Sequence, residues 1–232
     1  MNSHYRSLAF IFMVLLSNAA HAFDTSSFLA PGAEGQFIME RYSREIESDQ
    51  QQSELRIFRV GVNLFESPYS WVQGGFLLGY LETSHDNNIL TAGHSPVGKY
   101  FGIKLRSPKA QQQPLALHWS LSYLYNTVEQ SGTSSGSDIL WHDYQAELGI
   151  QFNAGNTRFS IGGYVAGMEG EEDRWEVISP SPTQYSSRQF KGDASSGAFL
   201  TAGYRIQRHH YIELKAKTGA LQGASLSFAT QY

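Results

Sequence analysis

Histidines and carboxylates stand side by side at two places in the sequence, and either pair could serve in acid–base chemistry. His142 precedes Asp143, and His85 precedes Asp86, with a further histidine at His94. A carboxylate and an imidazole can activate water together when both reach the same reacting atom. The spacing of the second group would permit a metal ion, but nothing in it specifies one.

The first pair lies in an alternating segment, Ile139–Phe152, which predicts a β-strand. Adjacent strand residues point to opposite faces, so His142 and Asp143 cannot act on one water molecule. The pair resembles the aspartate and histidine at the outer rim of omptin-type outer-membrane proteases, but no second acid pair accompanies it. We interpret His142 as an interfacial residue and Asp143 as a residue of the opposite face.

Two other groups have residue types that could do chemistry. His94 and Ser95 resemble the His–Ser pair of outer-membrane lipid A deacylases, but the longer motif of that family and a Gly-x-Ser-x-Gly elbow are both missing. An acidic cluster could hold Ca²⁺ or the divalent ions that bridge lipopolysaccharide, although acid runs are usually solvated. Its members are Glu169, Glu171, Glu172 and Asp173. We expect no catalytic site, no cofactor and no metal site.

Composition narrows the classes of protein further. The chain of 232 residues has no cysteine, which excludes a disulfide framework, a thiolate metal site and a lipidated N-terminal cysteine. The net charge of −4 gives no reason to expect nucleic acid as a partner. The mean hydropathy is −0.33, a value compatible with a membrane β-barrel, because only every second strand residue meets lipid.

The N-terminus reads as a secretory signal. Arg6 is followed by an apolar run from Leu8 to Leu16, and Ala20 and Ala22 fit a small-x-small cleavage site. An uncleaved membrane anchor is the alternative, but a transmembrane helix needs about 20 apolar residues. The pattern predicts a signal peptide at residues 1–22, cleaved after Ala22, and a single domain at residues 23–232.

Alternating segments fill the rest of the chain and predict ten antiparallel strands. Short connections near Glu66–Pro68, Asn153–Asn156 and Gln207–His209 alternate with long polar ones at Ser84–Pro96, Glu129–Asp138 and Glu169–Ser195. Short turns on one rim and long loops on the other are typical of outer-membrane barrels. The expected strands are Gln36–Ile46, Glu54–Phe65, Tyr69–Glu82, Val97–Arg106, Leu115–Val128, Ile139–Phe152, Thr157–Met168, Ser196–Ile206, His210–Thr218 and Gly223–Tyr232.

We therefore predict an all-β fold, a closed antiparallel transmembrane β-barrel of ten strands, with eight or twelve as alternatives. A soluble β-sandwich or lipocalin-like barrel would bury the apolar face instead. The face of the strands opposite the apolar one carries charges of both signs. These charges can pair within a narrow lumen, so they favour a barrel with lipid outside and the charged face inside. The predicted lumen charge network comprises Arg59, Lys104, Asp143, Glu147, Arg205, Glu213 and Lys215.

The last strand carries the clearest family signal. Leu226, Phe228 and the terminal Tyr232 share an apolar face, and Ser225 and Ser227 share the other. A strand that ends on a terminal aromatic residue resembles the C-terminal assembly signal of bacterial outer-membrane β-barrels. The resemblance implies residence in the cell outer membrane, contact with its lipid and lipopolysaccharide, and recognition by the barrel assembly machinery.

Three functions remain open from the sequence. The first is a non-enzymatic barrel of structural type, or one that interacts through its loops. The second is a narrow pore for small polar solutes, and the third is a surface hydrolase. We favour the first, because catalysis needs two groups near one reacting atom and the predicted faces separate the candidates.

Overall fold

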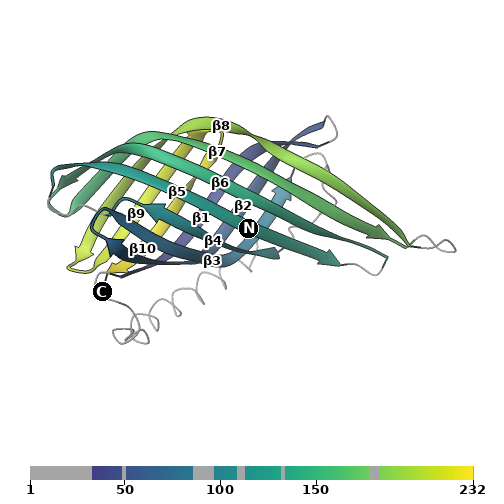
Figure 1. Cartoon of the computed structure of the whole chain (residues 1–232), viewed down its shortest axis with the longest axis horizontal. Coiled ribbons are helices and arrows are strands. Elements are labelled where there is room, and N and C mark those ends of the chain that lie inside the picture. Colours follow the sequence, from purple (N-terminus) through teal and green to yellow (C-terminus); the bar gives the residue numbers. More distant parts are fainter. Residues whose placement is uncertain are drawn as a thin grey trace, which may run out of the picture.

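A computed structural model describes residues 33–231, apart from 49–50, 86–96, 109–112, 132–133 and 178–182. Ten antiparallel strands form one closed ring in which each strand pairs with its neighbours in sequence and β1 pairs with β10 (Figure 1). The predicted fold class and strand number are confirmed. The strands are β1 (Glu34–Ser48), β2 (Gln51–Tyr69), β3 (Val72–His85), β4 (Val97–Arg106), β5 (Leu115–Ser131), β6 (Ser135–Ala154), β7 (Thr157–Glu176), β8 (Gln184–Gln207), β9 (His210–Gly219) and β10 (Gln222–Gln231).

No helix among the described residues is long and apolar enough to cross a membrane.

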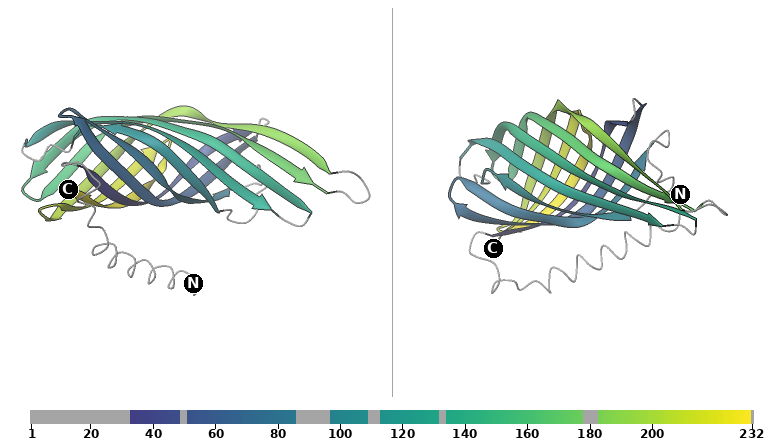
Figure 2. Two further views of the ribbon diagram at one scale, coloured as in Figure 1. Left: turned by 60° about the horizontal axis from the view of Figure 1, so that its bottom comes forward. Right: turned by 45° about the vertical axis from the view of Figure 1, so that its right-hand side comes forward.

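Both ends of the described chain lie at the same end of the barrel. Glu34 pairs with Gln231 across the β1–β10 seam, and the short turns that follow β2, β6 and β8 lie at this end too. We refer to it as the periplasmic end, in keeping with the pattern of short turns. Figure 2 shows the strongly tilted strands and the unequal height of the wall.

The outer wall of the barrel is apolar, as the alternation predicts. Side chains such as Phe76, Leu117 and Ile161 are more than half exposed on this face. Aromatic residues gather at two levels, with Tyr69 stacked on Trp71 near the periplasmic end and Phe101 against Tyr125 toward the other. Such a belt is stable only against lipid, and the two aromatic bands match the two membrane interfaces.

Two predicted loops are largely strand instead. The segments Glu129–Asp138 and Glu169–Ser195 mostly continue β5 to β8, so that β7 has 20 residues and β8 has 24. A tilted strand needs only about 9–11 residues to span a bilayer, so these strands extend well beyond it. Cross-strand pairs such as Trp175 with Tyr185 hold the extension together. The alternation pattern does not predict this strand extension, because both faces of the projecting strands carry polar residues.

The shortest hairpin lies beside the tallest strands. β9 and β10 have ten residues each and join at Ala220 and Leu221. Above this hairpin β1 reaches across to β8, where Glu47 pairs with Lys191. The wall is therefore closed by β10 at the level of the membrane and by the β1–β8 contact above it.

Glycines allow aromatic rings to lie flat against the inner wall. A methyl group on Gly61 would stand 2.1 Å from the Tyr100 hydroxyl, and one on Gly197 would stand 2.4 Å from the Tyr164 hydroxyl. Only a residue without Cβ permits these approaches. The rings narrow the lumen from opposite sides.

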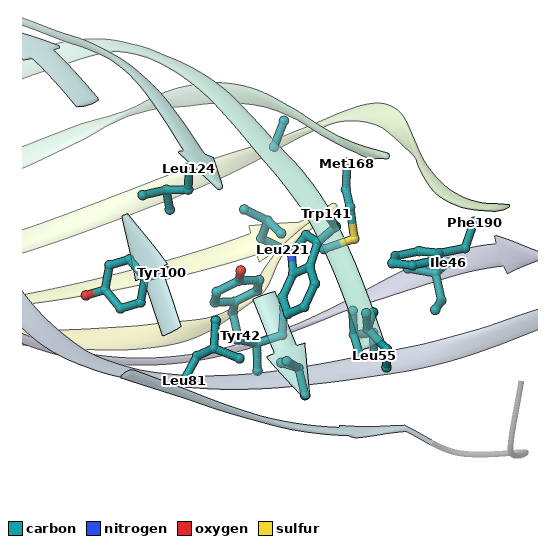
Figure 3. Close-up of a cluster of buried hydrophobic side chains, with 14 of the residues drawn as sticks. Tyr42, Ile46, Leu55, Leu81, Tyr100, Leu124, Trp141, Met168, Phe190 and Leu221 are labelled. Carbon is teal, nitrogen blue, oxygen red and sulfur yellow. The ribbon is translucent and has the colours of Figure 1, made fainter. Parts of the chain in front are cut away.

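An apolar cluster fills the lumen toward its outer end (Figure 3). Trp141, Ile46 and Leu55 are at most 2% exposed. The cluster draws side chains from β1 to β8 and from the β9–β10 turn, so it joins opposite walls. Its buried members are Tyr42, Ile46, Leu55, Ile57, Leu77, Leu81, Tyr100, Leu124, Val128, Ile139, Trp141, Tyr164, Ala166, Met168, Phe190, Phe199 and Leu221. We call these residues the apolar plug.

Candidate functional site

A polar cavity of about 130 Å³ lies in the lumen, mainly on the periplasmic side of the apolar plug. Inward-facing residues of β1, β2, β4, β6, β7 and β9 contribute its charged groups, which fall into three layers along the barrel axis. The charged side chains that line it are Glu40, Arg44, Arg59, Lys104, Arg106, Asp143, Glu147, Arg158, Glu213, Lys215 and Lys217.

The upper layer is centred on Asp143, directly below Trp141. Arg59 pairs with the Asp143 carboxylate and, at 3.2 Å, with Glu40, while Arg44 lies 3.6 Å from the other Asp143 oxygen. Trp141 Nε1 also donates to Asp143 at 3.2 Å. Two guanidinium groups thus face two carboxylates, and the layer is balanced.

The middle layer is centred on Glu147, which is 4% exposed. Its Oε1 accepts hydrogen bonds from Lys215 and from the Gln145 amide, each at 2.5 Å, and its Oε2 accepts one from Ser120 at 2.8 Å. Lys217 Nζ lies 3.7 Å from Oε1, and His118 Nε2 lies 3.6 Å from Oε2. Both carboxylate oxygens are therefore fully engaged.

The lower layer, nearest the periplasmic end, contains two ion pairs. Arg158 donates to Glu213 at 2.5 Å, and Arg106 lies 3.0 Å from the buried Glu34. Arg205 shares the inward face and packs over the Tyr211 ring at 5.6 Å, and it does not line the cavity.

The seven residues of the predicted lumen network lie on the inward faces of their strands. Asp143, Glu147, Glu213, Arg59 and Lys215 make the ion pairs described above. No ion pair with a described residue is found for Arg205 or Lys104, although the Glu147 carboxylate acts electrostatically on Lys104.

Several members of the three layers were not predicted from the sequence. Glu40 and Arg44 were obscured because charges occur on both faces of β1. Their shared even numbering with the inward-facing Gln36 is the signal that identifies their face. Arg158 carries the same signal on β7, where it shares parity with Ser160 and Tyr164.

The His142–Asp143 pair does not form a catalytic unit. His142 faces outward, where its Nδ1 lies 2.6 Å from the Tyr123 hydroxyl and its ring packs edge-on against Tyr125. Asp143 faces inward and accepts hydrogen bonds from the upper layer. Of the other candidates, Asp86, His94 and Ser95 lie outside the described residues, as does the side chain of His85.

The acidic cluster is divided between the two faces of β7. Glu172 is fully buried and lies 3.0 Å from Arg174, whereas Glu169, Glu171 and Asp173 are exposed on the outer face. Within the part of the chain that the structure describes, no group of three metal-binding side chains is close enough to hold an ion. The cluster lies on β7, whereas the sequence pattern placed it in the long connection Glu169–Ser195.

The last strand has the predicted two faces. Leu226 is 44% exposed toward the outside, and the Phe228 ring stacks on His210 with centroids 5.8 Å apart. Ser227 faces inward and accepts a hydrogen bond from Gln36 at 2.8 Å. Tyr232 lies outside the described residues.

No protein family and no curated protein matches the sequence. Solved structures do resemble the fold. The outer-membrane protease OmpT from Escherichia coli is 9% identical, with a TM-score of 0.51 over 87% of this chain and 95% of that one. This likeness shows the fold of a bacterial outer-membrane β-barrel and no activity.

Two further solved structures score lower. The translocator domain of the autotransporter NalP from Neisseria meningitidis is 10% identical, with a TM-score of 0.44 over 99% of this chain and 98% of that one. Ail, the attachment invasion locus protein of Yersinia pestis, is 9% identical, with a TM-score of 0.36 over 88% and 99% of the two chains.

Proposed function

We propose that the protein is a non-enzymatic, non-conducting barrel of the cell outer membrane that acts through the strands projecting from its outer end. The apolar plug is the observation that carries this proposal. Eight strands and the β9–β10 turn contribute side chains to it, and many of these are less than 5% exposed. Water and ions have no place in such packing, because each polar group would lose its hydration there.

The plug argues against the alternative of a narrow pore for polar solutes. A conducting lumen needs polar side chains or backbone groups along its whole length to replace water around the solute. Here the three polar layers end below Trp141, Ile139 and Val128. The layers stabilise the lumen by pairing across it and supply no path through it.

The charge layers also argue against hydrolysis in the lumen. A general base needs a lone pair directed at the substrate. Asp143 and Glu147 instead direct their oxygens at arginine, lysine, amide and hydroxyl donors. OmpT is a protease, but the fold it shares with this chain hosts different activities, and only the site can indicate one.

The outer hairpins are the surface that remains for function. The projecting parts of β5 to β8 carry the exposed acids Glu129, Asp138, Glu171 and Asp173 and the 81% exposed Tyr185 (Figure 1). Binding surfaces commonly occupy such extensions on a rigid scaffold. Below them, the apolar belt suits lipid and lipopolysaccharide, and Leu226, Phe228 and Tyr232 suit recognition by the assembly machinery.

Planar-bilayer recording on the purified, refolded protein tests this proposal. We expect no discrete conductance steps, and no turnover of peptide, phospholipid or lipopolysaccharide in parallel assays. Stable single-channel steps in the wild-type protein would support the pore instead. Turnover that disappears in His94→Ala while the barrel stays folded would support the hydrolase.

A further inference from the structure

The middle charge layer is not balanced. Lys104, Lys215 and Lys217 line the cavity beside a single carboxylate, that of Glu147. The upper layer pairs Arg44 and Arg59 with Glu40 and Asp143, and the lower layer pairs Arg106 and Arg158 with Glu34 and Glu213. The positive surplus along the cavity is therefore confined to one level of the lumen.

Lys104 is the ammonium group that Glu147 cannot reach. Both Glu147 oxygens already accept from Lys215, Gln145 and Ser120. Among the residues that the structure describes, none forms a hydrogen bond or salt bridge with Lys104, although the side chain lines the cavity. An ammonium group has three donors, and the partly buried Lys104 can offer them to whatever occupies the cavity.

The β5 neighbour of Lys104 borders the cavity. The cross-strand partners of Lys104 are Ser122 on β5 and Gly75 on β3. Ser122 lines the cavity and offers a hydroxyl donor, whereas the Phe65 ring covers Gly75 and forms the wall on that side. Lys215 and Lys217 border the same cavity from β9.

We infer that the lumen cavity binds a small inorganic anion, of halide or phosphate size, between Lys104, Ser122 and the lysines of β9. Lysine is suited to this role as a compact, rotatable point charge. The cavity of about 130 Å³ exceeds the roughly 30 Å³ that one water molecule occupies in the liquid, so a small ion and its waters fit. Three ammonium groups beside one carboxylate leave two positive charges, which a doubly charged phosphate would neutralise and a halide would halve. Either ion would fix the three ammonium groups.

Thermal unfolding of the full-length refolded barrel in detergent tests the inference. Sodium bromide and sodium phosphate are titrated in separate arms, with sodium gluconate, whose anion is too bulky for the cavity, holding the ionic strength constant. We expect the unfolding temperature to rise and saturate with one of the small anions. The arm with the lower half-saturation concentration identifies the size class of the ion.

Two variants separate site binding from a general salt effect. Lys104→Met removes a charge-assisted hydrogen bond, so we expect at least about tenfold weaker half-saturation. Lys99→Met, which removes an exposed lysine of the same strand, should leave the response unchanged. Equal responses in all three proteins, or no saturable response in the wild type, would overturn the inference.

Ser122→Asp covers the case in which Lys104→Met does not fold. This substitution places a carboxylate directly across from Lys104 and supplies one negative charge to the middle layer from within the chain. We expect it to unfold at a higher temperature than the wild type in gluconate alone and to lose the response to small anions. An unchanged anion response in Ser122→Asp would contradict the proposed site.

Discussion

The side chains of Asp143 and His142 lie on opposite sides of the barrel wall, although the residues are adjacent in sequence. Asp143 Oδ2 accepts a hydrogen bond from Trp141 Nε1 at 3.2 Å inside the lumen. His142 Nδ1 lies 2.6 Å from the Tyr123 hydroxyl on the outer face. The two residues consequently have different tasks, and they should respond differently to substitution.

Asp143→Asn should destabilise the barrel strongly. The substitution leaves the buried guanidinium groups of Arg59 and Arg44 without their common counter-charge, and breaking a buried ion pair typically costs about 3–5 kcal/mol. Urea unfolding followed by tryptophan fluorescence measures the effect. The matched control is His142→Gln on the outer face, which keeps a polar side chain and should cost less than about 1 kcal/mol. Equal losses in the two variants would contradict the inward assignment of Asp143.

Trp141→Ala should open a path through the apolar plug. The ring is 1% exposed, so its removal leaves a void beneath the outer end of the lumen and costs about 3–5 kcal/mol of stability. Planar-bilayer recording should then detect conductance steps that the wild type lacks. Trp71→Ala is the control, because this ring is 65% exposed on the outer wall. A silent but folded Trp141→Ala barrel would show that the remaining plug side chains seal the lumen alone.

Phe228→Asp should prevent assembly into the membrane. The residue lies on the lipid-facing side of the last strand, where a charge costs up to about 2–4 kcal/mol at the bilayer midplane. Immunoblotting of separated membrane fractions, with heat modifiability as the folding assay, follows the outcome. Phe228→Leu keeps the apolar face and should assemble normally. Wild-type membrane levels of Phe228→Asp would show that the assigned lipid face is wrong.

Cleavage of the signal peptide should leave Phe23 as the first residue of the exported protein. The prediction rests on the Ala20–Ala22 pattern that follows the apolar run. Edman sequencing or intact-mass measurement of protein from isolated outer membranes checks it. A mass that retains residues 1–22 would refute it.

The ten strands and the face of each lumen charge could be predicted from sequence because period two is a purely local signal. Glu147 and Lys215, for example, are assigned inward by the apolar residues on either side of them. The charge partners could not be predicted in this way. Asp143 meets Arg59 across 84 positions of sequence, and that contact depends on how the tilted walls face each other.

The apolar plug was also beyond sequence reasoning. Trp141 and Ile139 share the parity of Asp143 and Glu147, and the sequence predicted a network of charges in the lumen for this face of the strands. Near the outer end it is apolar, because side chains from opposite walls meet there and exclude water. Alternation along one strand contains no information about the strand opposite, so neither this packing nor the strand extension of β7 and β8 follows from it.

The contact of β1 with β8 above the short β9–β10 hairpin affects how the ring closes during folding. Hairpins between consecutive strands close small loops, whereas the β1–β10 and β1–β8 contacts join distant parts of the chain. Closure entropy grows with loop length, and contacts of long sequence separation form slowly. β1 forms a local hairpin with β2, so we expect its seam with β10 and β8 to close last. The seam is held at two heights, by β10 below and by β8 above. The pairing of Glu47 with Lys191 gives the seam a second point of resistance to unzipping from the outer end.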